Sequence, residues 1–268
     1  MKKYVLLLIM IVSSFLITGC QTAQNEASSV EETTSTTATP ASTTTTSTTS
    51  TTSTSTSTTT TVPSGSVIIK GNINKVEDYF GNADFYGEII NNSGGNVSFV
   101  EITITMKNAS GSVIDTDSTF INGTVLILNS SGIDTGSCLR PGEYGAFWVN
   151  TSTDFSDVAS YEYDLDWNTH AASNPSASLE VIGTINETTD FSGNRKFLGE
   201  IRNNSSTNAR FVIIYFICKN SAGKVINISS SYITGTDLSA GETNSFDVST
   251  SISPEEIGSY YYLFDWSE

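Results

Sequence analysis

The chain of 268 residues carries 12 Lys and Arg against 28 Asp and Glu, which gives a formal net charge of −16 at pH 7. An acidic surface repels nucleic acid and is not attracted to anionic lipid, so both are excluded as partners bound through charge. The chain has only three cysteines, which excludes a dense disulfide framework as its source of stability.

Residues 1–20 have the organisation of a secretion signal. Lys2 and Lys3 precede a largely apolar run from Tyr4 to Ile17, which two small residues separate from Cys20. This apolar run is shorter than the ~20 residues that a membrane-spanning helix needs. We therefore expect the chain to be exported.

Cys20 is the candidate lipidation site. It ends the stretch Leu-Ile-Thr-Gly-Cys, which resembles the lipoprotein box of prokaryotic proteins, where the cysteine thiol receives a diacylglycerol. Two or more acyl chains hold a protein stably on a bilayer, whereas a single chain is marginal. The resemblance implies a protein of the cell envelope that is anchored to the membrane through Cys20 and faces outward. A soluble secreted protein with an ordinary cleavage site is the alternative.

Residues 21–65 are predicted to form a disordered stalk. From Thr33 to Thr61 the chain consists of Ser and Thr apart from two alanines and one proline. Such small hydroxyl residues bury too little apolar surface to offset the entropy lost on ordering. At ~3.5 Å per residue, this tract reaches at most roughly 100 Å from the anchor. Tracts of this composition are often O-glycosylated.

Beyond the stalk, the sequence repeats itself. Segment 71–114 aligns without a gap with segment 183–226, at an offset of 183 − 71 = 112. After Thr124 the offset falls to 240 − 141 = 99, so the first copy holds 112 − 99 = 13 additional residues. Copies of this size are domains rather than solenoid units. The predicted organisation is a domain at 66–168 that includes the insertion, a linker at 169–176 and a domain at 177–268.

Each copy is predicted to be all-β. In segment 97–107, Val-Ser-Phe-Val-Glu-Ile-Thr-Ile-Thr-Met-Lys, apolar and polar side chains alternate with the period of two that is typical of a half-buried strand. The Asn and Gly that follow suit a type I turn into a second strand. No segment has helical periodicity, and turn residues recur about every 8 to 12 residues, as in two-sheet sandwiches. We therefore predict two tandem immunoglobulin-like β-sandwich domains.

Both copies share a framework of Gly-Glu-Ile and Asn-Asn-Ser, then an apolar strand, then a second Gly-Glu pair and a Phe. The framework positions are Gly87, Glu88, Asn92, Gly142, Glu143 and Phe147, paired with Gly199, Glu200, Asn204, Gly241, Glu242 and Phe246. This pattern resembles the FxLYD domain, although only Phe216 of the motif that gives the family its name is present literally. The resemblance implies an immunoglobulin-like sandwich, common in exported prokaryotic proteins, without catalytic residues or cofactors.

The sequence offers no convincing catalytic or metal site. His170 is the only histidine and falls in the predicted linker, so a histidine-based catalytic group has no partner there. We predict that the protein is not an enzyme and that it needs no cofactor. Asp115 and Asp117 alternate with hydroxyl residues and could supply half of a Ca²⁺ site, but a solvated turn is the favoured interpretation.

Two functions remain open. The first is a surface protein whose two sandwiches serve protein–protein interaction or envelope scaffolding. The alternative is carbohydrate binding, with Trp148 as an aromatic platform. Trp148 has Asp247 as its counterpart in the second copy, and strand alternation places it opposite to the core. Cover by the inserted segment 125–128 is the favoured explanation for its presence.

One strand of the second copy is predicted to be apolar on both faces. Ile213, Tyr215 and Ile217 stand where the first copy has Glu101, Thr103 and Thr105. Such a strand is expected where both faces are covered, or where an apolar patch marks an interaction site. The candidates for the cover are the first domain, the insertion and a separate partner, and a cover from within the chain is favoured because the linker is short. A register slipped by one residue is the alternative.

The two remaining cysteines and the Asn-x-Ser/Thr triplets are the other candidate sites of covalent chemistry. Cys138 and Cys218 are predicted to be free thiols, because they lie in different domains and Cys218 replaces Met106 on the core face. Ten Asn-x-Ser/Thr triplets are weak candidates for N-glycosylation, since a chain this rich in Asn, Ser and Thr makes many by chance. These are Asn91, Asn96, Asn108, Asn122, Asn129, Asn150, Asn186, Asn203, Asn204 and Asn227.

Overall fold

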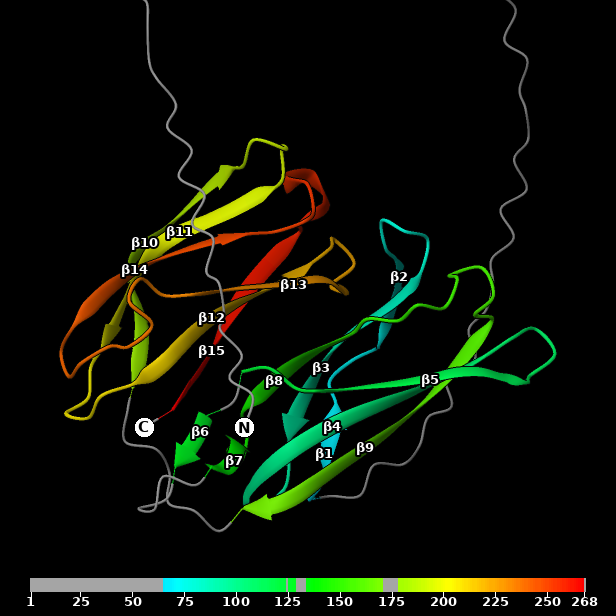
Figure 1. Ribbon diagram of the computed structural model, residues 1–268, viewed down its shortest axis with the longest axis horizontal. Helices are drawn as coiled ribbons and strands as arrows, with labels where there is room; N and C mark the ends of the chain where they lie inside the picture. Colours follow the sequence, from blue (N-terminus) through cyan, green and yellow to red (C-terminus); the bar gives the residue numbers. More distant parts are fainter. Residues whose placement is uncertain (1–64, 124, 129–133, 171–177, 268) are drawn as a thin grey trace, which may run out of the picture. The chain divides into compact units, whose positions relative to one another are not determined.

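The computed structural model describes residues 65–123, 125–128, 134–170 and 178–267 (Figure 1). The predicted signal segment, Cys20, nearly all of the stalk and most of the linker lie outside these residues, as does Asn129. Below, the first repeat is the described part of 65–170 and the second repeat is 178–267.

The prediction of an all-β chain is confirmed. The strands of the first repeat are β1 (Val67–Ile69), β2 (Asn74–Glu77), β3 (Ala83–Asn91), β4 (Asn96–Lys107), β5 (Val113–Phe120), β6 (Val125–Leu128), β7 (Asp134–Leu139), β8 (Tyr144–Val149) and β9 (Ser160–His170). Those of the second repeat are β10 (Leu179–Thr189), β11 (Arg195–Asn203), β12 (Arg210–Lys219), β13 (Val225–Tyr232), β14 (Thr243–Ser249) and β15 (Ser259–Ser267). The one helical element in the described part of the chain is a 3₁₀ turn at Pro254–Glu256. Strand β9 continues through His170, two residues past the predicted domain boundary at 168.

Each repeat builds two antiparallel sheets. In the first repeat, β3 pairs with β1, β2 and β8, while β4 pairs with β5 and β9. In the second, β11 lies between β10 and β14, and β12 lies between β13 and β15. The insertion adds the hairpin β6–β7: β7 pairs with β4, and β6 pairs in parallel with β15. One sheet of eight strands therefore runs through both repeats (Figure 1).

The alternation of the strands fills two separate cores. In the first repeat, Ile102 and Ile104 of β4 are fully buried with Phe85 and Phe147 of the opposite sheet. In the second, Val212, Ile214, Phe216 and Cys218 of β12 are fully buried with Phe197 and Phe246. The predicted strand register of β12 is therefore right, and the alternative of a register slipped by one residue is wrong. Two sheets packed around an apolar core make each repeat a β-sandwich.

The shared framework residues have structural roles that are the same in both repeats. Asn91 donates from Nδ2 to the carbonyls of Leu139 (2.8 Å) and Gly95 (3.0 Å), and its Oδ1 accepts from the amide of Ser93 (2.9 Å). Asn203 makes the equivalent contacts in the second repeat, with 3.0 Å to the carbonyl of Leu238. Each side chain is fully buried and joins backbone groups of two separate segments of its repeat.

A glycine in each repeat allows a phenylalanine ring to pack directly on the backbone. A Cβ added to Gly199 would lie 2.6 Å from Cζ of Phe246, and one added to Gly87 would clash in the same way with Phe147. Real Cβ atoms do not approach so closely, so only glycine fits these positions. Packing thus explains the glycine of the first Gly-Glu pair in each repeat, Gly87 and Gly199.

Candidate interaction surfaces

The two repeats contact each other through a third apolar cluster, here called the seam. Tyr86 and Ala146 of the first repeat are buried there with Ile217, Val225 and Ile228 of the second. The partly buried side chains of the seam are Val76, Tyr215, Tyr261 and Leu263. Through these contacts the two repeats belong to one compact unit.

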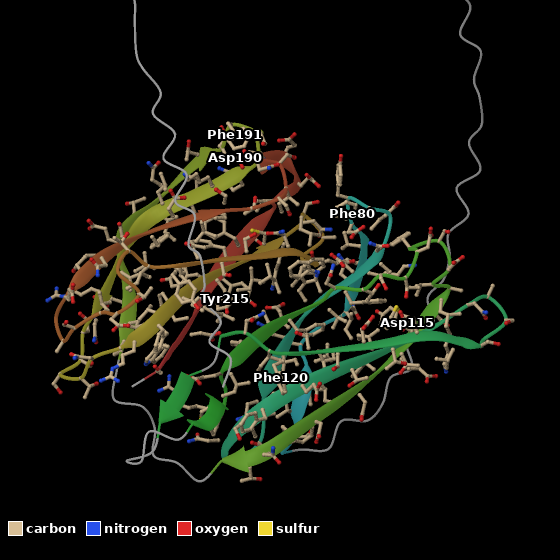
Figure 2. All side chains as sticks on the ribbon, viewed as in Figure 1. Phe80, Asp115, Phe120, Asp190, Phe191 and Tyr215 are labelled. Carbon is tan, nitrogen blue, oxygen red and sulfur yellow. The ribbon has the colours of Figure 1, made fainter. Side chains whose placement is uncertain are left out.

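The apolar outer face of β12 lies in this seam. Ile217 is fully buried in it, Tyr215 packs at its margin (Figure 2), and Ile213 is half-buried. The cover is the first repeat, so it comes from within the chain, as the sequence favoured. Ile217, predicted as a possible binding residue, is therefore unavailable to an external partner, because it has no exposed surface.

Polar contacts also cross the seam. Nζ of Lys219 lies 2.7 Å from Oε2 of Glu88, whose side chain is buried. Asn74 donates from Nδ2 to the carbonyl of Val225 (2.9 Å), and the amide of Gly123 donates to Oδ1 of Asp265 (2.7 Å). The pKa of Tyr261 is raised, mainly by burial in the seam and to a smaller extent by the negative charge of Glu88. Sequence reasoning missed Glu88 as a contact residue, because its only signal was membership of the repeated Gly-Glu framework.

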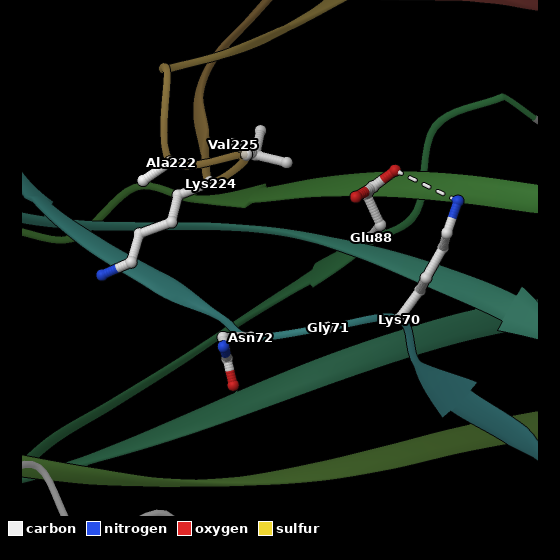
Figure 3. Close-up of a pocket in the computed structure, with 8 residues that line it drawn as sticks. Lys70, Gly71, Asn72, Glu88, Ala222, Lys224 and Val225 are labelled. Atoms are coloured by element: carbon white, nitrogen blue, oxygen red, sulfur yellow. Dashed lines mark ion pairs between the residues drawn. The ribbon is translucent and has the colours of Figure 1, made fainter.

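A small open cavity of about 220 Å³ lies beside this ion pair (Figure 3). It is lined by Lys70, Gly71, Asn72, Glu88, Ala222, Gly223, Lys224 and Val225. Oε1 of Glu88 accepts no hydrogen bond there, and Nζ of Lys70 lies 3.9 Å from it. Small-molecule sites usually enclose ~300–1,000 Å³, so this cavity suits a few waters, each taking ~30 Å³, better than an organic ligand.

Trp148 has the outward orientation that strand alternation predicted. Its neighbours Phe147 and Val149 are buried in the first core, while Trp148 itself is 41% exposed. Its ring stacks on Tyr86 with 5.9 Å between the centroids and 5° between the planes. Cover by the insertion was the favoured interpretation, but the side chains of 125–128 lie outside the described residues and Trp148 keeps a large exposed area.

A buried carboxylate supports this ring pair. Asp84 accepts hydrogen bonds from Nδ2 of Asn150 (2.9 Å) and from the hydroxyl of Tyr86 (3.3 Å). Burial raises the pKa of Asp84, and hydrogen bonds from Trp148 and Asn150 partly oppose that rise. The hydrogen bond to Asp84 therefore fixes the orientation of the exposed Trp148 ring.

Asp115 and Asp117 form no metal site in the described residues. Oδ2 of Asp115 accepts from the hydroxyl of Thr153 (2.6 Å), and Oδ1 accepts from the amide of Thr116 (2.9 Å). These hydrogen bonds lower the pKa of Asp115. The pKa of Asp117 is raised, mainly by burial and to a smaller extent by the negative charge of Asp115. No group of three potential ligands occurs in the described ranges. Asp115 thus ties β5 to the loop after β8 (Figure 2).

Three of the glycosylation candidates are corrected by the structure. Asn91, Asn203 and Asn227 are buried, and each uses Nδ2 as a hydrogen-bond donor, so a glycan cannot be attached without breaking the fold. Asn150, Asn186 and Asn204 are exposed, and Asn96, Asn108 and Asn122 are half-buried. The two core cysteines, Cys138 and Cys218, are free and buried, and burial raises the pKa of Cys218 to about 12.

Sequence reasoning missed a set of exposed aromatic side chains at equivalent places in the two repeats. At the tip of the β2–β3 hairpin, Tyr79 and Phe80 are 96% and 82% exposed. Phe191 at the β10–β11 tip, the counterpart of Tyr79, is fully exposed. Figure 2 shows Phe80 and Phe191 on turns that project from their strands. Asp78 and Asp190 hold these turns by accepting backbone amide hydrogen bonds.

A second repeated pair lies on the sheets of β4 and β12. Phe99 and Phe211 both have φ of 51°, a left-handed conformation that costs a bulky L-residue roughly 1–2 kcal/mol. Each sits where the pairing register shifts, in a β-bulge. They are 43% and 60% exposed, and exposed rings of the neighbouring strands, Phe120 (54%) and Tyr232 (54%), recur at equivalent places. Alignment of the two copies carries this signal, since position 99 matches 211 and 120 matches 232.

No family model matches the sequence, and no curated protein matches it. Solved structures give weak similarities. The exo-chitosanase of Amycolatopsis orientalis aligns with a TM-score of 0.24 and 13% identity over 72% of this chain and 25% of that chain. A red sea bream transglutaminase aligns with a TM-score of 0.22 and 10% identity over 75% of this chain and 31% of that chain. This chain thus spans about a quarter to a third of those proteins, and the likeness says nothing of activity.

The described residues contain no helix that is both long and apolar enough to cross a bilayer.

Proposed function

We propose that this protein is a lipid-anchored, non-catalytic component of a prokaryotic cell surface whose two FxLYD-like sandwiches bind a protein partner or scaffold the envelope. The observation that carries the proposal is the set of exposed aromatic side chains that recurs at equivalent positions of both repeats. Exposed aromatic clusters on an otherwise polar surface usually mark binding sites, because folding gains little from them.

The joining of the repeats supports a binding role. The buried Glu88–Lys219 pair, the apolar seam and the shared sheet hold one repeat on the other. Surfaces on a rigid body bind with less loss of conformational entropy than surfaces on a flexible one. The Ser/Thr tract and Cys20 complete the proposal, since together they lift this body away from the membrane to which it is tethered.

The binding role is tested by crosslinking on intact cells that express the native chain. Covalent adducts should form between the chain and a defined protein, and they should disappear when the exposed aromatic residues of both repeats are replaced by Asn. Recovery of the chain without any adduct at increasing crosslinker concentration would contradict the role. The anchor is tested separately. Cys20→Ser should prevent processing of the signal segment. Treatment that hydrolyses lipid esters should release the parent chain, and not the variant, from the membrane fraction.

Carbohydrate binding is the second candidate, and the exposed, stacked ring of Trp148 is the observation that favours it. Sugars pack their C–H faces on flat aromatic rings, and the exposed Asn150, which shares the Asp84 carboxylate with Trp148, has an amide oxygen to accept a hydrogen bond. Glycan-array binding by the purified chain that is lost in Trp148→Ala and kept in Asp247→Ala would support it. Equal binding by both variants would remove Trp148 from consideration.

A further inference from the structure

The two bulge phenylalanines are costly choices for the fold. Phe99 and Phe211 adopt φ of 51°, a conformation that Gly and Asn enter far more readily than an aromatic residue. The two positions are equivalent in the two repeats, so the same residue with the same φ occurs twice in one chain. A β-bulge disrupts the ladder locally and can re-aim a side chain, and in both repeats the ring at the bulge is exposed to solvent.

Packing inside the fold does not account for these rings. Phe99 is 43% exposed and Phe211 is 60% exposed. Phe99 meets Phe120 edge to face, with 6.4 Å between the ring centroids and 68° between the planes. Phe120 is itself 54% exposed, at the end of β5 (Figure 2). Each repeat therefore presents two outward rings at one end of its sheet rather than a buried cluster.

Carboxylates lie beside both ring pairs. In the first repeat, Glu101 is the cross-strand partner of both Phe120 and Asp166, and its Oε1 accepts from the hydroxyl of Ser118 (2.6 Å). In the second repeat, Oδ1 of Asp237 accepts from the amide of Phe211 itself (3.1 Å). Arg210 precedes that phenylalanine and is the basic group nearest in sequence. Rings next to carboxylates, on a chain of net charge −16, favour a cationic ligand over a neutral or anionic one.

The geometry points to a duplicated recognition site for basic protein segments, in which Phe99 with Phe120, and Phe211 with Tyr232, each receive an Arg or Lys side chain. The ring faces attract the cation, and Glu101 or Asp237 supplies the compensating charge. The inference rests on the proposed binding function and adds its site and the chemistry of its partner. It predicts two equivalent sites per chain.

The test is isothermal titration calorimetry of the full chain in detergent with a hexa-arginine peptide. The parent should bind two peptides. Phe99→Asn or Phe211→Asn should each remove one site, and the double variant should remove both, so that its affinity for the peptide is about tenfold or more below that of the parent. Asn suits the left-handed conformation, so thermal melting of these variants should stay equal or rise, which separates lost binding from lost folding. Raising NaCl from about 0.05 to about 0.5 M should weaken binding to the parent, because salt screens charges.

Three further variants decide what the rings contribute. Phe99→Leu with Phe211→Leu keeps apolar bulk without a ring face and should bind as poorly as the Asn pair, whereas the corresponding Tyr pair should bind like the parent. Tyr79→Asn with Phe191→Asn removes two equally exposed rings elsewhere and should keep both sites. Full binding by the Phe→Asn pair, or salt-independent competition by chitohexaose, would overturn the inference, the second result in favour of a glycan. Cellular crosslinks that persist in the Phe→Asn pair would leave the general binding role standing and this site refuted.

Discussion

The two repeats share one frame but bury opposite outer faces. In the first repeat, the outward residues Tyr86 and Glu88 of β3 are buried against the second repeat. Their counterparts on β11 are Leu198, which is half-buried, and Glu200, which is exposed. On the other sheet the difference is reversed, since Ile217 is buried in the seam and its counterpart Thr105 is not.

The contact is therefore between unlike faces, from one repeat to the next in a single direction. Such heterologous contacts extend indefinitely unless the terminal faces are made unsuitable. Here those faces are polar: Lys196 pairs with Asp247 (2.8 Å) where the first repeat has Asp84 and Trp148, and Thr103 and Thr105 replace Tyr215 and Ile217. A few outward residues, and not the sandwich frame, thus determine where the two repeats pack on each other.

Alkaline pH should have the largest effect, because the seam holds three tyrosines at positions where the other repeat has no tyrosine. Burial raises the pKa of Tyr86, Tyr215 and Tyr261 above the ordinary ~10. Above pH 10 the unfolded chain loses these protons while the native chain keeps them, so stability falls as pH rises. Each tyrosine contributes about 1.4 kcal/mol per pH unit, or about 4 kcal/mol for the three together.

Chemical denaturation at pH 9, 10 and 11, followed by tyrosinate absorbance, measures this effect. The free energy of unfolding should be flat below pH 10 and fall steeply above it. A flat profile up to pH 11 would show that the tyrosines are accessible and that the seam is open in solution.

Removing the buried charge should have the next largest effect. Glu88→Gln keeps the shape of the side chain but leaves Lys219 without its counter-charge, at a cost of about 3 kcal/mol. The matched control is Glu200→Gln at the equivalent exposed position, which should change stability by less than about 0.5 kcal/mol. Urea denaturation of both variants at pH 7 makes the comparison, and equal effects would mean that the seam does not bury Glu88.

Exchanging the outward residues of β4 and β12 gives a sharper test of what orients the pair. Ile217→Thr places a hydroxyl in a fully buried apolar position and should cost about 2 kcal/mol. Thr105→Ile, the reverse change in the first repeat, should stay within about 0.5 kcal/mol and should increase self-association, because it begins to recreate an apolar docking face. Thermal denaturation and sedimentation velocity report the two effects; no loss of stability in Ile217→Thr contradicts its burial.

The smallest difference is expected at Trp148. Its stacking on Tyr86 predicts a loss of about 1 kcal/mol in Trp148→Ala, against less than about 0.5 kcal/mol in Asp247→Ala. Equilibrium unfolding monitored by far-ultraviolet circular dichroism resolves this difference. A larger loss in the aspartate variant would show that the Lys196–Asp247 pair matters more than the ring stack.

The sequence predicted the fold correctly wherever the local pattern of apolar and polar residues determines the structure. Alternation in segment 97–107 and its copy predicted β4 and β12 with the right faces inward, since the core side of a strand is set by its own residues. The apolar outer face of β12 likewise indicated a cover. Glu88 and Glu200 are the same residue in the same framework, yet only one is buried, because burial depends on the other repeat. The left-handed backbone conformation of Phe99 could not be predicted either, because a phenylalanine in an apolar strand suggests regular pleating and the sequence does not reveal the shift in pairing register.

The parallel pairing of β6 with β15 sets the order in which the molecule can be completed. Val125 pairs with Trp266 and Leu126 with Ser267, so this ladder joins residues 266 − 125 = 141 positions apart. Contacts of such long range form late, after the local hairpins, because closing the intervening loop is entropically costly. During synthesis β15 emerges after the other described strands, and until it arrives one edge of the apolar Val-Leu-Ile-Leu segment is unpaired, the kind of edge that recruits other chains. Completion of the second repeat thus closes the first, and the interval before it is when a nascent chain is most exposed to aggregation.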